Sequence, residues 1–200
     1  VIHPKLKEKR KFAVCTSNNN KKWSAAMHVF MDGLCDQAKT VFMCMQECGI
    51  VDEEECQRAG CRVLGKLMPV VTGNQLSYGS AILMRNGDEE DELATATWKH
   101  VEVVENFVHA AVSHRLAVVN VYVSPKTKVA DREVFVGKVN DFFLQTLGTR
   151  QVVIGGDFND PKSKWITAVY DMWEHRDQES IFQCNKHTFV ARGSGAKSLL

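Results

Sequence analysis

The segment Val153-Ile154-Gly155-Gly156-Asp157-Phe158-Asn159 decides how this 200-residue chain is interpreted. Residues 151–154 are expected to form a strand that ends in the apolar run typical of a buried one, and the two glycines that follow allow the backbone to turn tightly. Asp157 and Asn159 then flank an aromatic residue that we expect to be buried. An Asp/Asn-rich turn held by local side-chain hydrogen bonds is the ordinary alternative. The other interpretation, which we favour, is a catalytic loop at the end of a strand.

Three more expected strands carry polar side chains at or just beyond their ends. Strands that lie side by side in a sheet bring such ends together, even when they are far apart in sequence. The sequence therefore predicts a polar pocket at one edge of a sheet. The candidate residues are Asn18 with Asn20, Glu47, Asn120 with Tyr122, and Asp157 with Asn159.

The hydrophobic patterns alternate between strands and helices along the whole chain. This order indicates α/β layers, with sheets at the core and helices outside. The acidic runs at 52–55 and 88–92 are expected to be solvated loops. The expected strands are 12–17, 40–46, 78–84, 95–104, 107–113, 116–123, 151–154 and 187–190, and the expected helices are 22–37, 129–147 and 165–173.

The composition is that of a globular protein, with 44% hydrophobic and 24% charged residues. A formal net charge of +1 provides no global field for nucleic acid, so any attraction to phosphate must be local. Residues 1–11 form a basic arm, which we interpret as solvated, the alternative being contact with a phosphate backbone. No stretch approaches the roughly 18 apolar residues of a membrane span, so no membrane partner is expected.

Seven cysteines occur in surroundings that are mostly apolar, which favours reduced thiols and an intracellular location. Four of them are conceivable zinc ligands: Cys44, Cys48, Cys56 and Cys61. Because no CxxC pair is present and their spacing is irregular, we do not predict a zinc site.

The residue types at the strand ends suit the hydrolysis of a phosphodiester. Glu47 with an amide oxygen of Asn18 offers hard oxygen ligands of the kind that hold Mg²⁺. Asp157 can orient and deprotonate a water molecule, while Asn159 and Tyr122 supply neutral donors for phosphate oxygens. Taken singly, Glu47 is equally well a surface or capping carboxylate, and Tyr122 is more often half-buried packing.

Four segments together resemble the successive motifs of the endonuclease/exonuclease/phosphatase family, and they occur in that family's order between residue 12 and about residue 200. These segments are Met45-Gln46-Glu47, Tyr78-Gly79-Ser80-Ala81-Ile82, Asn120-Val121-Tyr122-Val123-Ser124-Pro125 and Gly156-Asp157-Phe158-Asn159. The resemblance implies a deoxyribonuclease I-like fold, which is a four-layered α/β sandwich of two packed β-sheets flanked by helices. It also implies dependence on Mg²⁺ or Mn²⁺.

The resemblance further implies a role for each matched residue. Glu47 corresponds to the metal ligand, Asn18 to an active-site amide near that metal, and Tyr122 to a phosphate contact. Asp157 and Asn159 correspond to the groups that orient the nucleophilic water and the scissile phosphate.

Within the family, the chain is most similar to the apurinic-endonuclease-like domain of LINE-type retrotransposons. The Gln46-Glu47 pair, the Gly-Asp-Phe-Asn form and the ending Ser198-Leu199-Leu200 favour this subfamily. The similarity implies an endonuclease that nicks DNA as part of a longer polyprotein, and it implies a nuclear location. The sequence does not indicate an oligomeric state.

The chain departs from the family at the last motif, an Asp followed by His, which has no counterpart among the seven histidines. We therefore expect residues 12–200 to form a domain that lacks its C-terminal catalytic strand, with Ser198 beginning that region and contributing to substrate binding. Two alternatives stay open. The chain is an inactive relative or binding module, or it is a phosphatase or phosphodiesterase for lipid or small-molecule phosphates.

Overall fold

The fold was analysed in a computed structural model that describes residues 10–19, 26–72, 75–87, 90–124, 127, 129–146 and 150–159. The chain separates into two units, Val1–Phe158 and Asn159–Leu200, and every element below belongs to the first unit. The helix predicted at 165–173, the strand predicted at 187–190 and nearly all of the basic arm lie outside the described residues.

The first sheet has four strands in the order β1-β2-β6-β3. Strand β1 (Arg10–Asn18) runs parallel to β2 (Ala38–Gln46), whereas β6 (Ser80–Asn86) is antiparallel to β2 and to β3 (Cys61–Leu67). Between β3 and β6, the short strands β4 (Val70–Thr72) and β5 (Gln75–Ser77) pair as a two-stranded ribbon.

The second sheet repeats this pattern of directions, in the order β10-β9-β8-β7. Strand β10 (Gln151–Asp157) is parallel to β9 (Leu116–Tyr122), and the antiparallel strands β8 (Val108–Val112) and β7 (Lys99–Val104) follow. Each sheet therefore carries one parallel pair at one of its edges.

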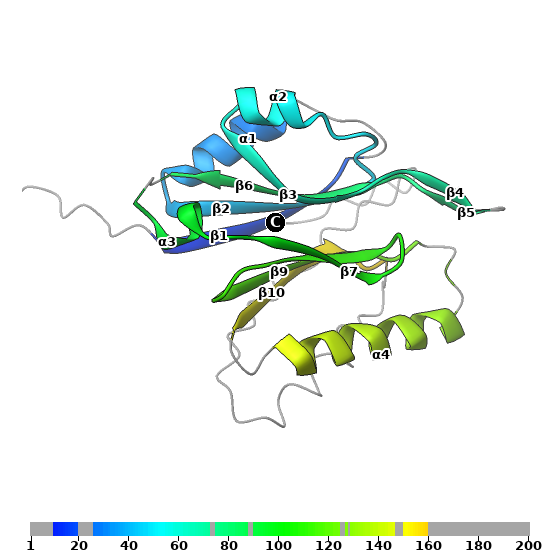
Figure 1. Cartoon of the computed structure of the whole chain (residues 1–200). Helices are drawn as coiled ribbons and strands as arrows, with labels where there is room; N and C mark the ends of the chain where they lie inside the picture. Colours follow the sequence, from blue (N-terminus) through cyan, green and yellow to red (C-terminus); the bar gives the residue numbers. More distant parts are fainter. Residues whose placement is uncertain are drawn as a thin grey trace, which may run out of the picture. The chain divides into compact units, whose positions relative to one another are not determined.

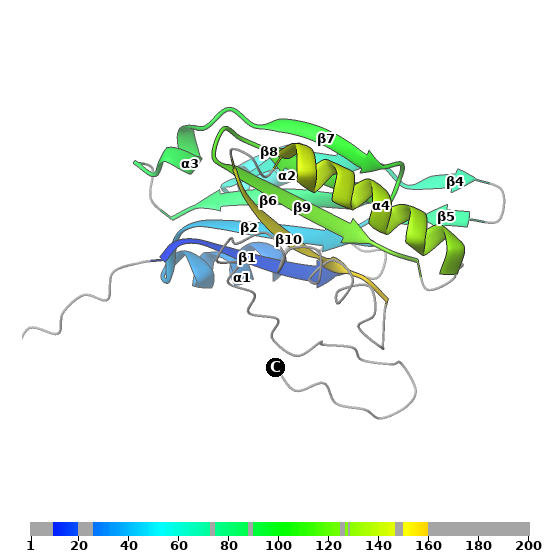
Figure 2. The ribbon, with the colours of Figure 1, turned by 90° about the horizontal axis from the view of Figure 1, so that it is seen from below.

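Helices cover the outer faces of the two sheets, as Figures 1 and 2 show. Helices α1 (Ala26–Cys35) and α2 (Glu53–Arg58) pack on the first sheet, and α4 (Val129–Thr146) packs on the second. The short helix α3 (Glu92–Thr95) lies between β6 and β7 in sequence. Two packed β-sheets flanked by helices are the predicted architecture, which is confirmed. No helix in the described part of the chain is long and apolar enough to cross a bilayer.

Two apolar clusters explain why residues 40–46 are almost continuously hydrophobic. Along β2, Val41 and Met43 pack toward the helices, whereas Phe42 and Cys44 pack between the two sheets. Side chains alternate across a strand, so a strand that is covered on both faces needs apolar residues at every position. Phe42, which is fully buried, contacts the ring of Trp98 edge-on at 5.4 Å between centroids.

Both acidic runs were wrongly expected to be loops throughout. Asp52 accepts a hydrogen bond from the backbone N–H of Glu55 at 3.0 Å and caps α2, whose first turn is acidic. Carboxylates are favoured there because the N-terminus of a helix carries partial positive charge. In the second run Asp91 caps α3, so the predicted strand 95–104 begins only at Lys99.

The prediction of a turn at Gly155-Gly156 is also wrong, because both glycines lie inside β10. Their small size has another reason, which is close packing. A Cβ atom on Gly156 would lie 2.0 Å from the carbonyl oxygen of Val121 on the neighbouring strand, and one on Gly155 would lie 3.0 Å from Sγ of Cys44. Glycine thus allows β10 to approach its neighbours closely while it delivers Asp157 to the end of the strand.

Candidate active site

The two parallel strand pairs end on the same side of the sandwich, and the arrows of β1, β9 and β10 point toward that side in Figure 2. Asn18 is paired with Gln46 in the first sheet, so Glu47 follows directly beside it. Tyr122 is paired with Asp157 in the second sheet. Parallel pairing therefore brings four of the predicted site residues to one edge.

Two side-chain hydrogen bonds connect these residues from one sheet to the other. The hydroxyl of Tyr122 donates to Oε1 of Glu47 at 2.8 Å, and Nδ2 of Asn18 donates to Oδ2 of Asp157, also at 2.8 Å. The first bond joins residues 75 positions apart, and the second joins residues 139 positions apart. Each carboxylate of the predicted site thus has a neutral donor from the opposite sheet.

Glu47 has an unusual backbone conformation, with a φ of 50°. This left-handed region is uncommon for residues other than glycine, and its strain is often found at functional sites. The following loop is held by hydrogen bonds from Cys48 N–H to Gly79 O at 3.3 Å and from Gly49 N–H to Tyr78 O at 2.8 Å. Gly79 is required there because a Cβ atom would lie 2.6 Å from Gly49 O. The neighbouring backbone therefore maintains the conformation of Glu47.

Tyr122 is nearly buried, with 4% of its surface exposed. Burial raises the pKa of its hydroxyl well above the ordinary value, and the hydrogen bond to the negatively charged Glu47 raises that pKa further. The hydroxyl consequently keeps its proton at neutral pH and acts as a hydrogen-bond donor.

Asn120 was predicted as a substrate contact, but the structure places its side chain in the interior between the sheets. Its Nδ2 donates to the carbonyl oxygens of Met45 at 2.8 Å and Ala81 at 3.0 Å, and its Oδ1 accepts from Nε2 of Gln46 at 2.6 Å. A side chain that is 0% exposed and bonded at both ends does not reach substrate in this arrangement. We correct its place from the pocket to the support behind it.

Gln46 and His109 belong to the same interior group, and neither was predicted as a site residue. Gln46 is a polar residue inside an apolar strand, and His109 interrupts the apolar run of β8. A polar side chain in a strand covered on both faces was the available signal, because such a group must find a buried partner.

Three predicted site residues stay predictions. Asn20 and Ser198, both predicted to bind substrate, lie outside the described residues. Asn159 has a φ of 45° and is the first residue of the second unit.

The donor set at the strand ends fits Mg²⁺ or Mn²⁺ better than zinc. Tyr122 occupies one oxygen of Glu47, and within the described part of the chain no cation forms an ion pair with this carboxylate. Among those same residues, no three His, Cys, Asp or Glu side chains gather into a metal cage. Magnesium needs only one or two carboxylates, since it keeps several of its waters. Glu47 and the amide of Asn18 are the groups that can hold such an ion.

No protein-family model matches the sequence, and no curated protein matches it. Among solved structures, an AP endonuclease from Archaeoglobus fulgidus is similar to 81% of this chain over 70% of its own length. The sequence identity is 15% and the TM-score is 0.48. This likeness concerns the course of the backbone and none of the residues above.

Proposed function

We propose that this chain forms the core of a metal-dependent phosphodiester hydrolase that nicks DNA. The observation that carries the proposal is the pair of 2.8 Å hydrogen bonds, Tyr122 to Glu47 and Asn18 to Asp157, at one edge of the two sheets. These bonds bring three groups together: Asp157 as a proton acceptor, Glu47 as a ligand for a hard cation, and Tyr122 as a hydroxyl donor. Glu47 keeps its negative charge, because no cation pairs with it in the described part of the chain.

Glu47 and Asn18 would hold Mg²⁺ or Mn²⁺, which supplies neutralisation of the charge that develops on the phosphate. Asp157 accepts a proton from the attacking water, a contribution of about 10²- to 10⁴-fold in rate. The amide of Asn18 fixes the orientation of that carboxylate through its hydrogen bond.

In this proposal the Tyr122 hydroxyl, whose one proton is donated to Glu47 in the structure, turns to a nonbridging phosphate oxygen when substrate binds and donates there. Its raised pKa supports the role, because a hydroxyl that stays protonated can donate throughout the neutral range. Asn159 is assigned the second neutral donor on its sequence position alone.

DNA is proposed as the substrate because the Gln46-Glu47 pair, the Gly-Asp-Phe-Asn form and the ending Ser198-Leu199-Leu200 resemble retrotransposon endonucleases. Because the formal net charge is only +1, contact with the phosphate backbone has to come from local groups. A retrotransposon polyprotein and a nuclear location belong to the same proposal.

The test is nicking of supercoiled plasmid by the intact parent polypeptide with Mg²⁺, with Mn²⁺ and with EDTA. We expect nicking only with a divalent ion, and a loss of about 10²-fold or more for Asp157→Asn. Asp141→Asn, an exposed change on α4, serves as the matched control and should keep the full rate.

Three outcomes contradict the proposal. Absence of metal-dependent nicking would leave an inactive relative or binding module, and an unchanged rate for Asp157→Asn would remove the proposed proton acceptor. Turnover of a phosphoinositide in place of plasmid would assign the site to lipid phosphates.

A further inference from the structure

A set of buried polar side chains crosses the space between the two sheets directly behind the candidate site. We call the four fully or almost fully buried members the interlayer network: Gln46, Ser80, His109 and Asn120, which are 1%, 3%, 0% and 0% exposed. Two side chains that are more exposed than these four extend the network, Thr16 at one end and His100 at the other.

Hydrogen bonds and close polar contacts connect the network from end to end. Thr16 Oγ1 donates to Gln46 Oε1 at 3.1 Å, and Gln46 Nε2 donates to Asn120 Oδ1 at 2.6 Å. Nε2 of His109 lies 3.2 Å from Asn120 Nδ2 and 3.1 Å from Ser80 Oγ. Nδ1 of His109 lies 3.0 Å from Nε2 of His100.

Burying two amides and an imidazole between apolar sheets costs free energy that an apolar core would not lose. Every member is satisfied, so the network rigidifies the interior and specifies one arrangement of the strands. Its position indicates which arrangement that is.

The network binds the two strands that carry the predicted metal ligand and the predicted phosphate donor. Gln46 immediately precedes Glu47, and Asn120 lies two residues before Tyr122. Asn120 Nδ2 also donates to the main-chain carbonyl of Met45, two residues before Glu47. Beyond this connection, Tyr122 and Glu47 are themselves hydrogen bonded.

We propose that Gln46 and Asn120 are positioning residues, which set the separation between the Glu47 carboxylate and the Tyr122 hydroxyl by locking the end of β2 to β9. The inference rests on the proposed function for its effect on catalysis. Neither residue touches the reacting atoms. A displacement of about 1 Å at a reacting group can lower a rate by about 10²-fold, so loss of this lock should be visible in kcat.

The first test is Gln46→Met, which keeps the length of the side chain and removes its three amide hydrogen bonds, to Thr16, Asn120 and the carbonyl oxygen of Cys44. We expect kcat for plasmid nicking to fall at least about tenfold while KM for DNA changes less than about twofold, because binding surfaces are untouched. In the double variant Gln46→Met/Tyr122→Phe, the loss of rate should be smaller than the product of the two single losses. Both substitutions act on the same Tyr122–Glu47 pair.

Thr40→Val is the matched control for general loss of stability. Thr40 is also 0% exposed on β2 and donates to Asp91 Oδ2 at 2.5 Å. It lies six residues before Gln46, which is roughly 20 Å along the strand. We expect this variant to unfold at a lower urea concentration, as Gln46→Met does, but to keep its kcat.

A second measurement is independent of catalysis. With ¹³Cζ-labelled tyrosine, the NMR signal of Tyr122 reports the hydrogen bond to Glu47, and Glu47→Gln provides the reference for a weakened bond. We expect Gln46→Met to move the signal toward that reference, and the surface-accessible change Thr16→Val to move it less in the same direction. Thr16→Val serves as the readout if Gln46→Met does not fold.

The outcomes separate the two proposals. An unchanged Tyr122 signal in both variants, or a full kcat in folded Gln46→Met, overturns the positioning role. A shifted signal in a protein whose wild type does not nick DNA supports the positioning role and overturns the proposed function.

Discussion

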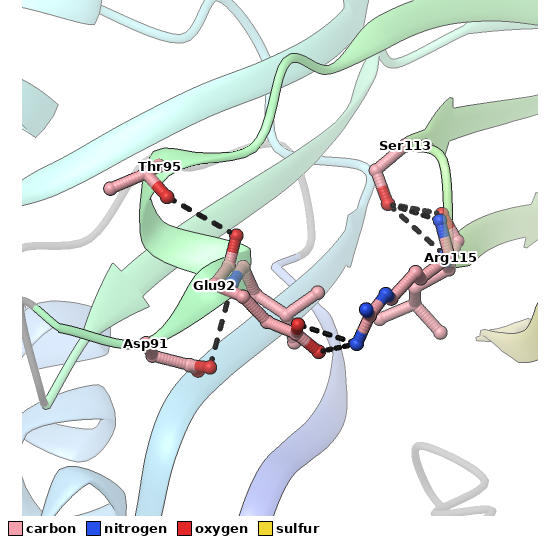
Figure 3. Close-up of polar contacts among 7 residues, drawn as sticks. Asp91, Glu92, Thr95, Ser113 and Arg115 are labelled. Atoms are coloured by element: carbon pink, nitrogen blue, oxygen red, sulfur yellow. Dashed lines mark hydrogen bonds and ion pairs between the residues drawn. The ribbon is translucent and has the colours of Figure 1, made fainter.

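At the two ends of β9, a glutamate carboxylate is bound by different kinds of donor. At the end of the strand, Tyr122 donates a neutral hydroxyl to Glu47. Just before its start, Nη1 of Arg115 lies 2.7 and 2.5 Å from the two carboxylate oxygens of Glu92, as the paired dashed lines in Figure 3 show. Both contacts lie at an end of the sandwich, and both involve one glutamate.

The difference lies in the charge that remains. The guanidinium of Arg115 cancels the negative charge of Glu92, so that pair has little attraction left for a cation. A tyrosine hydroxyl orients Glu47 without cancelling its charge, which stays available for a metal ion. The groups around Arg115 are consistent with this difference, because they serve local structure. The Ser113 hydroxyl, for example, accepts a hydrogen bond from the Leu116 N–H at 3.1 Å.

The strongest test of this contrast exchanges each glutamate for glutamine. Glu47→Gln should lower metal-dependent nicking by about 10³-fold, since metal stabilisation of transition-state charge is worth several kcal/mol. Glu92→Gln should leave the rate within about twofold of the wild type, because it changes a surface ion pair only. Rates measured over a range of Mg²⁺ concentrations decide the matter, and equal losses in the two variants would refute the contrast.

The second prediction concerns the backbone that delivers Asp157. Gly156→Ala should reduce the free energy of unfolding by about 3 kcal/mol or more, because overpacking against fixed backbone is costly and the new Cβ would lie 2.0 Å from Val121 O. Gly137→Ala is the control on helix α4, where nothing lies within 4 Å. It should stabilise the protein by about 0.5–1 kcal/mol. Urea denaturation of both variants measures the difference.

The third prediction concerns His109, a buried member of the interlayer network that lies between the two ends of the sandwich compared above. Burial lowers its pKa to about 3, with a further contribution from His100. Since an unfolded histidine titrates near pH 6.5, the unfolded state binds more protons between about pH 6.5 and 3. Stability should therefore fall as the pH drops through this range, by about 1.4 kcal/mol per pH unit at most from this group.

Urea unfolding at pH 7 and pH 5 measures that dependence. His109→Gln should flatten it, whereas His114→Gln, an exposed change before β9, should keep the slope of the wild type. A slope that is the same in all three proteins would show that His109 is not the group responsible.

The smallest expected effect is at the Arg115 end. Arg115→Ala should change the free energy of unfolding by less than about 1 kcal/mol, because exposed ion pairs contribute little, and the Arg115 and Glu92 side chains are 62% and 50% exposed. The nicking rate should not change. A large loss of activity would show that the two ends are coupled, and would remove the basis for treating them separately.

Much of the fold could be predicted from the sequence because β2 and β9 are covered on both faces and are accordingly apolar at most positions. Strand β3 was not predicted, since Arg62, Gly65 and Lys66 interrupt its pattern. The reason for Gly65 lies in another strand. A Cβ atom there would lie 2.3 Å from Cδ2 of His100, a contact that only the folded sandwich creates.

The members of the candidate site were accessible from the sequence, but their pairing was not. Polar residues at strand ends identified Asn18, Glu47, Tyr122 and Asp157, which the structure brings together. Which residue bonds to which depends on strand order in two sheets, and periodicity carries no information on that order. For the same reason, Asn120 was placed in the pocket instead of behind it.

Among the residues that the structure describes, strands β1 and β10, which carry Asn18 and Asp157, lie at the edges of their sheets. An edge strand is hydrogen bonded on one side only, so it opens locally at a lower free energy than a central strand. Fraying of either strand separates Asn18 from Asp157 while β2, β6, β8 and β9 remain folded. The site is therefore attached to the least protected part of a stable frame, and amide hydrogen exchange should be faster in β1 and β10 than in the centre of either sheet.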